Sequence, residues 1–376
     1  MSSSIANILA APIVNLIRKS KQMSPVSIKH VFCVALLLSC LSPFNTFAGS
    51  KGVAYVSNQK GGVSVIDLDT LEITGVLDVV AKEPRGIGVT SDGKWLVTAN
   101  KFDGNISVVD TATGKLVKHV SIGKNPEFVR VLGNIAFVTF EPSLKAGAIP
   151  QQGSKDTKKE DEEDKVPGHV AIVDLATGKI ILDIVGKPET EGVEITNDGN
   201  QVIVTNESDN SISVHDINSG RLIKNVSVSK YGERPRGIKS APDGINYVTT
   251  LEFSNKLLVL NDTFEPIKEV STGKTPYGVS YDVDGKRVFV ATNKEKTLQV
   301  FDAKTWKKIK DIPVGDRCWH FTFTPDNQQI LLACGKSNEI LVIDANQLIV
   351  TKRISDNDMP WGIVTYPKSM GSLDRP

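Results

Sequence analysis

The sequence has few of the residues that most often carry catalytic or metal chemistry. Its 376 residues include only five histidines and four cysteines. His30 is expected to be lost with an N-terminal signal peptide, and His119, His169 and His215 are expected on or beside outer strands, so a multi-histidine metal site lacks its ligands. The sequence contains no CxxCH haem motif, Gly-x-Ser-x-Gly turn or glycine-rich phosphate loop. We therefore expect no metal and no catalytic residues.

Two further features are absent, a charge excess and a long apolar run. The formal net charge is +1, whereas nucleic-acid-binding domains usually carry a clear basic excess. After residue 50 no apolar run is long enough to span a membrane. These absences argue against nucleic acid as a partner and against a membrane span in the mature chain.

The N-terminal segment has the pattern of a secretory signal peptide. Lys29 and His30 precede an apolar run over residues 31–41, and Thr46-Phe47-Ala48 is a small-x-small cleavage site. We expect residues 1–48 to be removed on export to the periplasm, with the mature domain spanning 49–376. Met23 competes with Met1 as the initiator. Leu38-Ser39-Cys40 fits an acylation site poorly, so a lipid anchor is not expected.

What the sequence does contain is one repeated unit. A short apolar strand ends in Asp or Asn at seven places, and successive copies are 41 to 45 residues apart except for one spacing of 64. Each unit reads as four strands bounded by turn residues, and tandem repeats of this kind are typical of a β-propeller. The copies end at Asp67, Asp110, Asp174, Asp216, Asn261, Asp302 and Asp344. We predict an all-β fold, a seven-bladed β-propeller of four-stranded antiparallel blades.

The order of strands predicts how the ring closes. The first copy starts at Ala54-Tyr55-Val56-Ser57, which aligns with the second strand of a blade, and the last ends with a first strand over 361–367. The closing blade should therefore combine an inner C-terminal strand with three N-terminal strands, which removes the open edges.

The two cysteines of the mature chain flank one hairpin. Cys318 and Cys334 lie nearly symmetrically about a turn at residues 325–328, which places them almost opposite each other. In an oxidising compartment a cross-strand disulfide is one reading, and two unbonded small residues are the other.

One insertion interrupts the repeat, at residues 143–167. It is rich in charge and contains no aromatic residue, a composition that predicts disorder. It falls between the second and third strands of its blade, at the same end of the ring as the loops that lead into first strands. It is either a solvated loop or a lid or docking tail over that end.

Candidate functional residues lie where the chain enters each inner strand. These elbows mostly read Pro-X-Gly, and the middle residues should ring one mouth of the central channel. They are Arg85, Glu127, Glu191, Arg236, Tyr277, Trp319 and Trp361, with His320 beside them. Arginine pairs carboxylates bidentately and aromatic rings stack flat groups, so the ring could bind an acidic small ligand or an acidic loop of a partner. The alternative is a structural ring in which Arg and Glu neutralise one another.

Glu127 and Glu191 are the one pair suited to acid–base chemistry, as glycosidases use. We expect the neighbouring arginines to lower the pKa of both carboxyls, which would disfavour a general acid.

The repeats resemble the YVTN family of bacterial β-propellers over residues 52–367. The segments YVSN, VSVIDLDTLE and PRGIGVTSDGK carry this resemblance. The ordered set of elbows further resembles a seven-repeat subfamily associated with catabolism dependent on pyrroloquinoline quinone (PQQ), within a superfamily that includes amine dehydrogenase heavy subunits. Cys318 in its elbow and the insertion depart from that subfamily.

The resemblance implies an exported protein, with no established reaction of its own, that is associated with PQQ-dependent alcohol oxidation. We expect it to be a non-catalytic monomer that supports this oxidation. Its partner would be a quinoprotein dehydrogenase or a cytochrome c, and PQQ itself is a candidate ligand. Two alternatives remain open: a subunit of a periplasmic dehydrogenase or a hydrolase, and a structural scaffold of the cell envelope.

Overall fold

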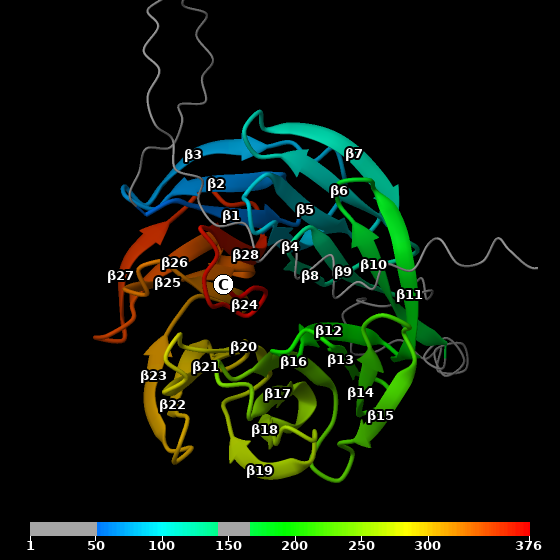
Figure 1. Ribbon diagram of the computed structural model, residues 1–376. Coiled ribbons are helices and arrows are strands. Elements are labelled where there is room, and N and C mark those ends of the chain that lie inside the picture. The colour runs from blue at the N-terminus through cyan, green and yellow to red at the C-terminus, as the bar shows by residue number, and fades with distance from the viewer. Residues whose placement is uncertain (1–50, 142–165) are drawn as a thin grey trace, which may run out of the picture.

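The computed structural model describes residues 51–141 and 166–376. Within them the chain forms seven four-stranded sheets around a central axis (Figure 1), which confirms the seven-bladed β-propeller. The predicted signal peptide and nearly all of the predicted insertion lie outside the described residues. Pro167, expected at the end of the insertion, instead begins a strand.

Each blade is an antiparallel sheet whose first strand lies nearest the axis. The closing blade contains β28 (Pro360–Tyr366), β1 (Val53–Asn58), β2 (Val63–Asp67) and β3 (Glu72–Leu77). The next three blades contain β4 (Pro84–Val89), β5 (Trp95–Asn100), β6 (Asn105–Asp110), β7 (Lys115–Ser121), β8 (Val129–Leu132), β9 (Ile135–Phe140), β10 (Pro167–Asp174), β11 (Lys179–Pro188), β12 (Thr190–Ile195), β13 (Gln201–Asn206), β14 (Ser211–Asp216) and β15 (Leu222–Ser227). The last three contain β16 (Pro235–Ser240), β17 (Tyr247–Leu251), β18 (Lys256–Leu260), β19 (Pro266–Ser271), β20 (Pro276–Tyr281), β21 (Arg287–Thr292), β22 (Thr297–Asp302), β23 (Lys308–Pro313), β24 (Cys318–Phe323), β25 (Gln329–Cys334), β26 (Glu339–Asp344) and β27 (Ile349–Ile354).

The ring closes as the strand order predicts. β1 pairs with β2 on one side and with β28 on the other, so the closing blade joins both ends of the described chain. Tyr55 faces Val65 in one register and Val364 in the other. Each blade therefore keeps two edge strands, the innermost, which lines the channel, and the outermost, which lies at the rim.

The burial of each strand follows its distance from the axis. All six residues of the inner strand β12 are buried, whereas the outer strand β3 alternates between exposed and less exposed positions. Inner strands are covered on both faces by neighbouring blades, and outer strands are covered on fewer sides. The hydrophobic core therefore lies between the blades.

The repeated Asp has a structural role at the turn after the third strand. Oδ1 of Asp67 accepts the backbone N–H groups of Asp69 and Thr70, at 2.9 and 2.8 Å. Asp302 and Asp344 hold their turns in the same way. A short side-chain acceptor that closes its own turn explains why this position repeats.

Two short 3₁₀ helices interrupt the strands, η1 (Glu252–Ser254) and η2 (Gly335–Ser337). Across the described ranges no helix has the length and apolar character needed to cross a membrane.

Candidate functional site

The elbows share one backbone geometry. The residue that precedes each elbow's first position has φ between 52° and 62°, in the left-handed region, although none of the seven is glycine. These residues are Glu83, Asn125, Glu189, Arg234, Thr275, Arg317 and Met359. A left-handed conformation costs a non-glycine residue roughly 1 kcal/mol, so other contacts must hold the elbows in place.

One such contact comes from the residue that follows the second strand of the blade. The N–H of Glu207 donates to the carbonyl of Glu189 at 2.8 Å, and the N–H of Asn293 donates to that of Thr275 at 2.9 Å. The same bond recurs in four more blades, and in the remaining blade Glu141 donates to Lys124. We call the end of the ring where these elbows lie the elbow face.

Hydroxyl groups on second strands join neighbouring elbows. Thr205 Oγ1 accepts the N–H of Gly192 and donates to the carbonyl of Arg236, both at 2.8 Å. Thr250 links Gly237 to Tyr277 in the same way. Each bridge connects one blade to the next, which fixes the spacing of the elbow residues around the axis.

The structure brings the predicted arginines and glutamates together as ion pairs. Arg85 Nη1 pairs with Glu127 across the blade boundary, and Arg85 Nη2 lies 2.6 Å from Glu83 Oε1. The side chains of Arg85 and Glu127 are mostly buried. Both hydrogen-bonding edges of the Arg85 guanidinium are thus occupied by carboxylates.

Arg236 is the centre of a larger network. Its Nε lies 2.6 Å from Glu252 and its Nη1 lies 2.7 Å from Glu191, while Nη1 also donates to Tyr277 Oη at 2.9 Å. Glu207 pairs with both Arg236 and Arg234. A carboxylate ligand would have to displace these partners to reach either arginine of the mouth.

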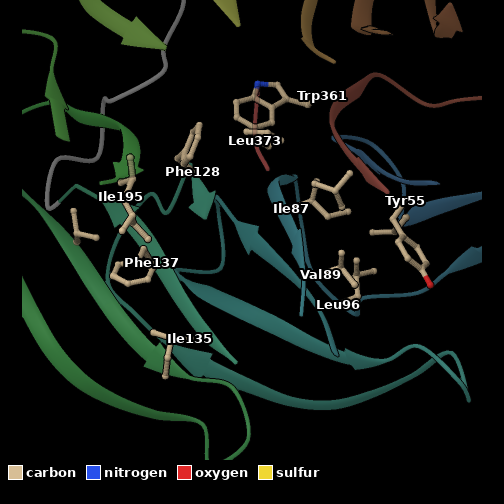
Figure 2. Packing of buried hydrophobic residues seen from close by; sticks show 14 of the residues in the cluster. Tyr55, Ile87, Val89, Leu96, Phe128, Ile135, Phe137, Ile195, Trp361 and Leu373 are labelled. Atoms are coloured by element: carbon tan, nitrogen blue, oxygen red, sulfur yellow. The ribbon is translucent and has the colours of Figure 1, made fainter. Parts of the chain in front are cut away.

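Aromatic side chains fill the channel next to this network. His320 is the central member, with its ring centroid 4.3 Å from that of Trp361, 5.3 Å from that of Tyr277 and 6.2 Å from that of Phe128. In Figure 2 the side chain of Phe128 lies near those of Trp361 and Leu373. Trp361 is only 1% exposed. The sequence suggests Trp361→Ala as a test of ligand binding. Because Trp361 is part of the hydrophobic core, this substitution would also change the packing.

Trp319, predicted to line the mouth, is buried and packs against its own blade at the elbow face. Its ring lies against Gly335, where an added Cβ would approach Trp319 to 1.9 Å, and it contacts Arg317. The sequence could not indicate the contact between Trp319 and Gly335, because the space for the indole ring depends on the missing side chain of Gly335 after β25.

The C-terminal segment closes the other end of the channel, which the sequence analysis did not predict. After β28 the chain turns back along β24, where Phe323 N–H donates to Met370 at 2.8 Å and Ser372 N–H donates to Phe321 at 2.9 Å. Ser372 Oγ lies 3.0 Å from His320 Nδ1. Figure 1 shows this red segment at the centre of the ring. The C-terminal segment therefore occupies the channel at the end opposite the elbow face.

A buried ionic group anchors the C-terminal segment. Lys239 Nζ donates to the carbonyl of Asp374 at 2.7 Å and lies 3.6 Å from Glu194, and Arg130 lies 3.5 Å from the same carboxylate. Burial alone would raise the pKa of Glu194, but Arg130, Lys239 and Arg375 lower it to about 2. Glu194 thus stays ionised and ties the segment to the channel wall.

Sequence reasoning also missed a second ring at the elbow face. The residue that follows each second strand lies beside the elbow of its own blade, as its backbone hydrogen bond shows. These positions are Gln59, Lys101, Glu141, Glu207, Glu252, Asn293 and Gly335. The sequence signal for this ring is the residue after each second strand, which is charged in four of the seven blades.

The two candidate acid–base carboxyls have opposite pKa shifts. Burial, with the charge of Glu127 next in importance, raises the pKa of Glu191 to about 7 despite Arg236. Burial acts on Glu127 too, but Arg85, Lys101 and Arg236 lower its pKa below the ordinary value. The expectation that arginines lower both is therefore wrong for Glu191, because its burial is the larger effect.

The cysteines face each other on β24 and β25 and form a disulfide in the structure. Of the two readings left open by the sequence, the structure has the bonded one.

Comparisons with known proteins agree with the fold. The sequence profile of the YNCE-like beta-propeller family matches residues 42–136, about a quarter of the chain. No curated protein matches the chain. The general resemblance to bacterial repeat propellers is thus supported, and the matched segment is too short to assign the whole chain to that family.

Three solved structures illustrate the similarity in fold. A protein of unknown function from Desulfotomaculum acetoxidans is 18% identical with a TM-score of 0.69, covering 84% of this chain and 98% of that one. Hydrazine synthase from Kuenenia stuttgartiensis is 17% identical with a TM-score of 0.66, covering 78% and 92%. The periplasmic gluconolactonase of Pseudomonas aeruginosa is 16% identical with a TM-score of 0.64, covering 84% and 99%. At these identities the similarity shows the fold alone.

Proposed function

We propose that this chain is a non-catalytic binding propeller that holds a partner protein or a small ligand at its elbow face. Within that function we propose that it supports a periplasmic PQQ-dependent alcohol oxidation system, with a quinoprotein dehydrogenase or a cytochrome c as the partner. The support for this assignment is the resemblance of the ordered elbows to the PQQ-associated subfamily.

The observation that carries the binding function is a set of buried polar atoms without partners. Among the described residues, such atoms gather at the elbow face: Asn58 Oδ1, Gln59 Nε2, Asn125 Nδ2, Glu141 Oε2 and Asn293 Oδ1. Folded proteins leave few buried polar atoms unsatisfied, so a local concentration calls for a ligand, a partner or bound water. The other end of the channel is occupied by the C-terminal segment.

The test is a titration of the mature protein with a soluble cytochrome c and, separately, with PQQ. We expect saturable binding of one of them, weakened at high salt because the elbow face is ionic. Amide hydrogen exchange should then show slower exchange at the elbows, around residues 83–86 and 234–237, and no change at residues 369–375. If neither probe binds, the chain is not a member of this oxidation system.

A second candidate function is the hydrolysis of a sugar lactone. The split pKa values of Glu127 and Glu191 favour it, because a buried carboxyl with a pKa of about 7 can accept a proton from an attacking water near neutral pH. The named activity of the gluconolactonase with this fold makes gluconolactone the substrate to try. Turnover above the uncatalysed rate that is lost in Glu191→Gln would establish this function, and a rate equal to buffer alone would exclude it.

A further inference from the structure

The ionic network at the elbow face has more carboxylates than cations. Its ion pairs join Arg85, Arg234 and Arg236 to five glutamates besides Glu127, and Lys101 and Glu141 interact electrostatically with the same groups. The carboxylates are Glu83, Glu127, Glu141, Glu189, Glu191, Glu207 and Glu252, and the cations are Arg85, Lys101, Arg234 and Arg236. Seven carboxyl groups against four cations leave three carboxyl groups without a counterion, so each of these three must hold a proton or meet another cation.

Within the part of the chain that the structure describes, Glu141 is the carboxylate of this network that lacks a partner. Its side chain is only 7% exposed, its Oε2 has no hydrogen-bond partner, and it takes part in none of the ion pairs that the structure forms. Its strongest electrostatic interactions are with Glu127, Glu191, Glu189 and Glu207, all carboxylates. An isolated carboxylate in such surroundings is costly unless a proton or a cation compensates it.

The geometry of the side chains favours an organic cation over a metal ion. Within residues 51–141 and 166–376 no three His, Cys, Asp or Glu side chains are grouped to hold a metal. An ammonium group needs only hydrogen-bond acceptors, and Glu141 Oε2 is a buried acceptor that has no partner among the described residues.

We propose that the elbow face binds an organic ammonium group through Glu141, supplied by a small free amine or by a lysine of a protein partner. This inference rests on the proposed binding function and reverses the ligand charge expected from the sequence. Lys101 is the other charged residue of the second ring that forms no ion pair among the described residues. Its positive charge repels a bound ammonium group and so makes the site selective among amines.

Binding should compete with protons. Burial raises the pKa of Glu141, Glu207 and Glu191, and those three groups match the three excess charges. The charged groups that act on Glu141 are Glu127, Glu189, Glu191 and Glu207. Glu127 and Glu207 interact in turn with Arg85, Lys101, Arg234 and Arg236, and the Lys124 carbonyl accepts the N–H of Glu141. Amine affinity should therefore rise as the pH rises, and binding at neutral pH should release protons.

The experiment is isothermal titration calorimetry of the full mature protein with three probes. Diaminobutane represents the free amine, a basic cytochrome c represents lysines on a partner, and glutarate is the anionic control. We expect diaminobutane or the cytochrome to bind, with proton release measured in buffers of different ionisation enthalpy, and we expect glutarate not to bind.

Three variants locate the site. Glu141→Gln keeps the shape of the side chain and should weaken amine binding about tenfold or more, since one charge-assisted hydrogen bond is lost. Glu265→Gln removes an exposed charge from the turn between β18 and β19, at the opposite end, and should change nothing. Lys101→Met should tighten amine binding several-fold, since it removes a like charge.

The outcomes separate this inference from the proposed function. Binding of glutarate without binding of either cationic probe would overturn the ammonium site while leaving the elbow face as a binding surface. Unchanged amine affinity in Glu141→Gln would also overturn it. Diaminobutane binding without cytochrome or PQQ binding would support the site and exclude the proposed oxidation system. No binding of any probe would overturn both.

Discussion

The raised pKa of Glu191 predicts that the folded protein loses stability as the pH rises. The carboxyl has a pKa of about 7 in the folded state against 4.5 for the ordinary group. A raised folded pKa means that the folded state holds the proton more firmly, so this stabilisation is complete below pH 4.5 and is lost as the pH rises through 7. At about 1.4 kcal/mol per pKa unit the loss amounts to about 3 kcal/mol.

Glu191→Gln isolates this contribution. Glutamine cannot ionise, but it can still accept hydrogen bonds from Arg236 and Tyr277, the partners of Glu191. The assay is guanidinium unfolding of wild type and variant at pH 5 and at pH 8. Between these values the wild type should lose about 2 to 3 kcal/mol of unfolding free energy relative to the variant.

The comparison across pH cancels the direct effect of the substitution on packing and hydrogen bonding. Glu265→Gln, which changes an exposed charge at the opposite end of the ring, serves as the control and should follow the wild type. An equal difference between wild type and Glu191→Gln at both pH values would refute the reasoning. A difference of opposite sign would mean that Arg236 outweighs burial.

Four further predictions concern the scaffold. Leu373→Ala, in a side chain that is 1% exposed, should lower the unfolding free energy by about 2 to 5 kcal/mol, measured by denaturant titration against Leu373→Met, which should cost much less. Thr205→Val should cost about 1 to 3 kcal/mol, because the buried Gly192 N–H and Arg236 carbonyl lose their shared partner; a melting temperature equal to wild type would contradict the bridging role. Truncation after residue 359 removes β28 and should abolish cooperative unfolding of the whole ring, so a truncated protein that melts like the full chain would disprove the closure. Thiol titration under denaturing conditions should find no free thiol from Cys318 and Cys334 before reduction, and two free thiols would exclude the disulfide.

The sequence predicted the scaffold well because the scaffold repeats. Seven copies of an apolar strand ending in Asp or Asn mark the third strand of every blade, and the Pro-X-Gly elbows mark where the inner strands begin. One such strand and turn would be weak evidence for a blade, but the same pattern at seven regularly spaced places is specific for a propeller.

The site could be predicted only as a set of positions. The elbow residues were identified, but which arginine meets which glutamate depends on the reach of side chains across blade boundaries. Arg236 contacts Glu252 of its own blade and Glu191 of the preceding one. The pKa of Glu191 depends on how far the network is buried, which no local pattern reports.

The C-terminal segment could not be predicted at all. Residues 368–376 read KSMGSLDRP, which has neither the alternation of a strand nor the spacing of a repeat. Their position depends on the width of the channel and on the charges of Lys239 and Lys368, which contact Asp374. These features exist only once the ring has closed.

The seven left-handed elbow residues have a consequence for how such a surface can change during evolution. Their backbone conformation is held by bonds from main-chain N–H groups, and the side chains found there are as different as Glu, Asn, Arg, Thr and Met. Since no particular side chain is needed to shape the elbow, a single substitution can alter the charge presented at one position while the frame stays intact. Related chains with the same elbow backbone can therefore change their ligand specificity by single substitutions, each of which leaves a folded protein.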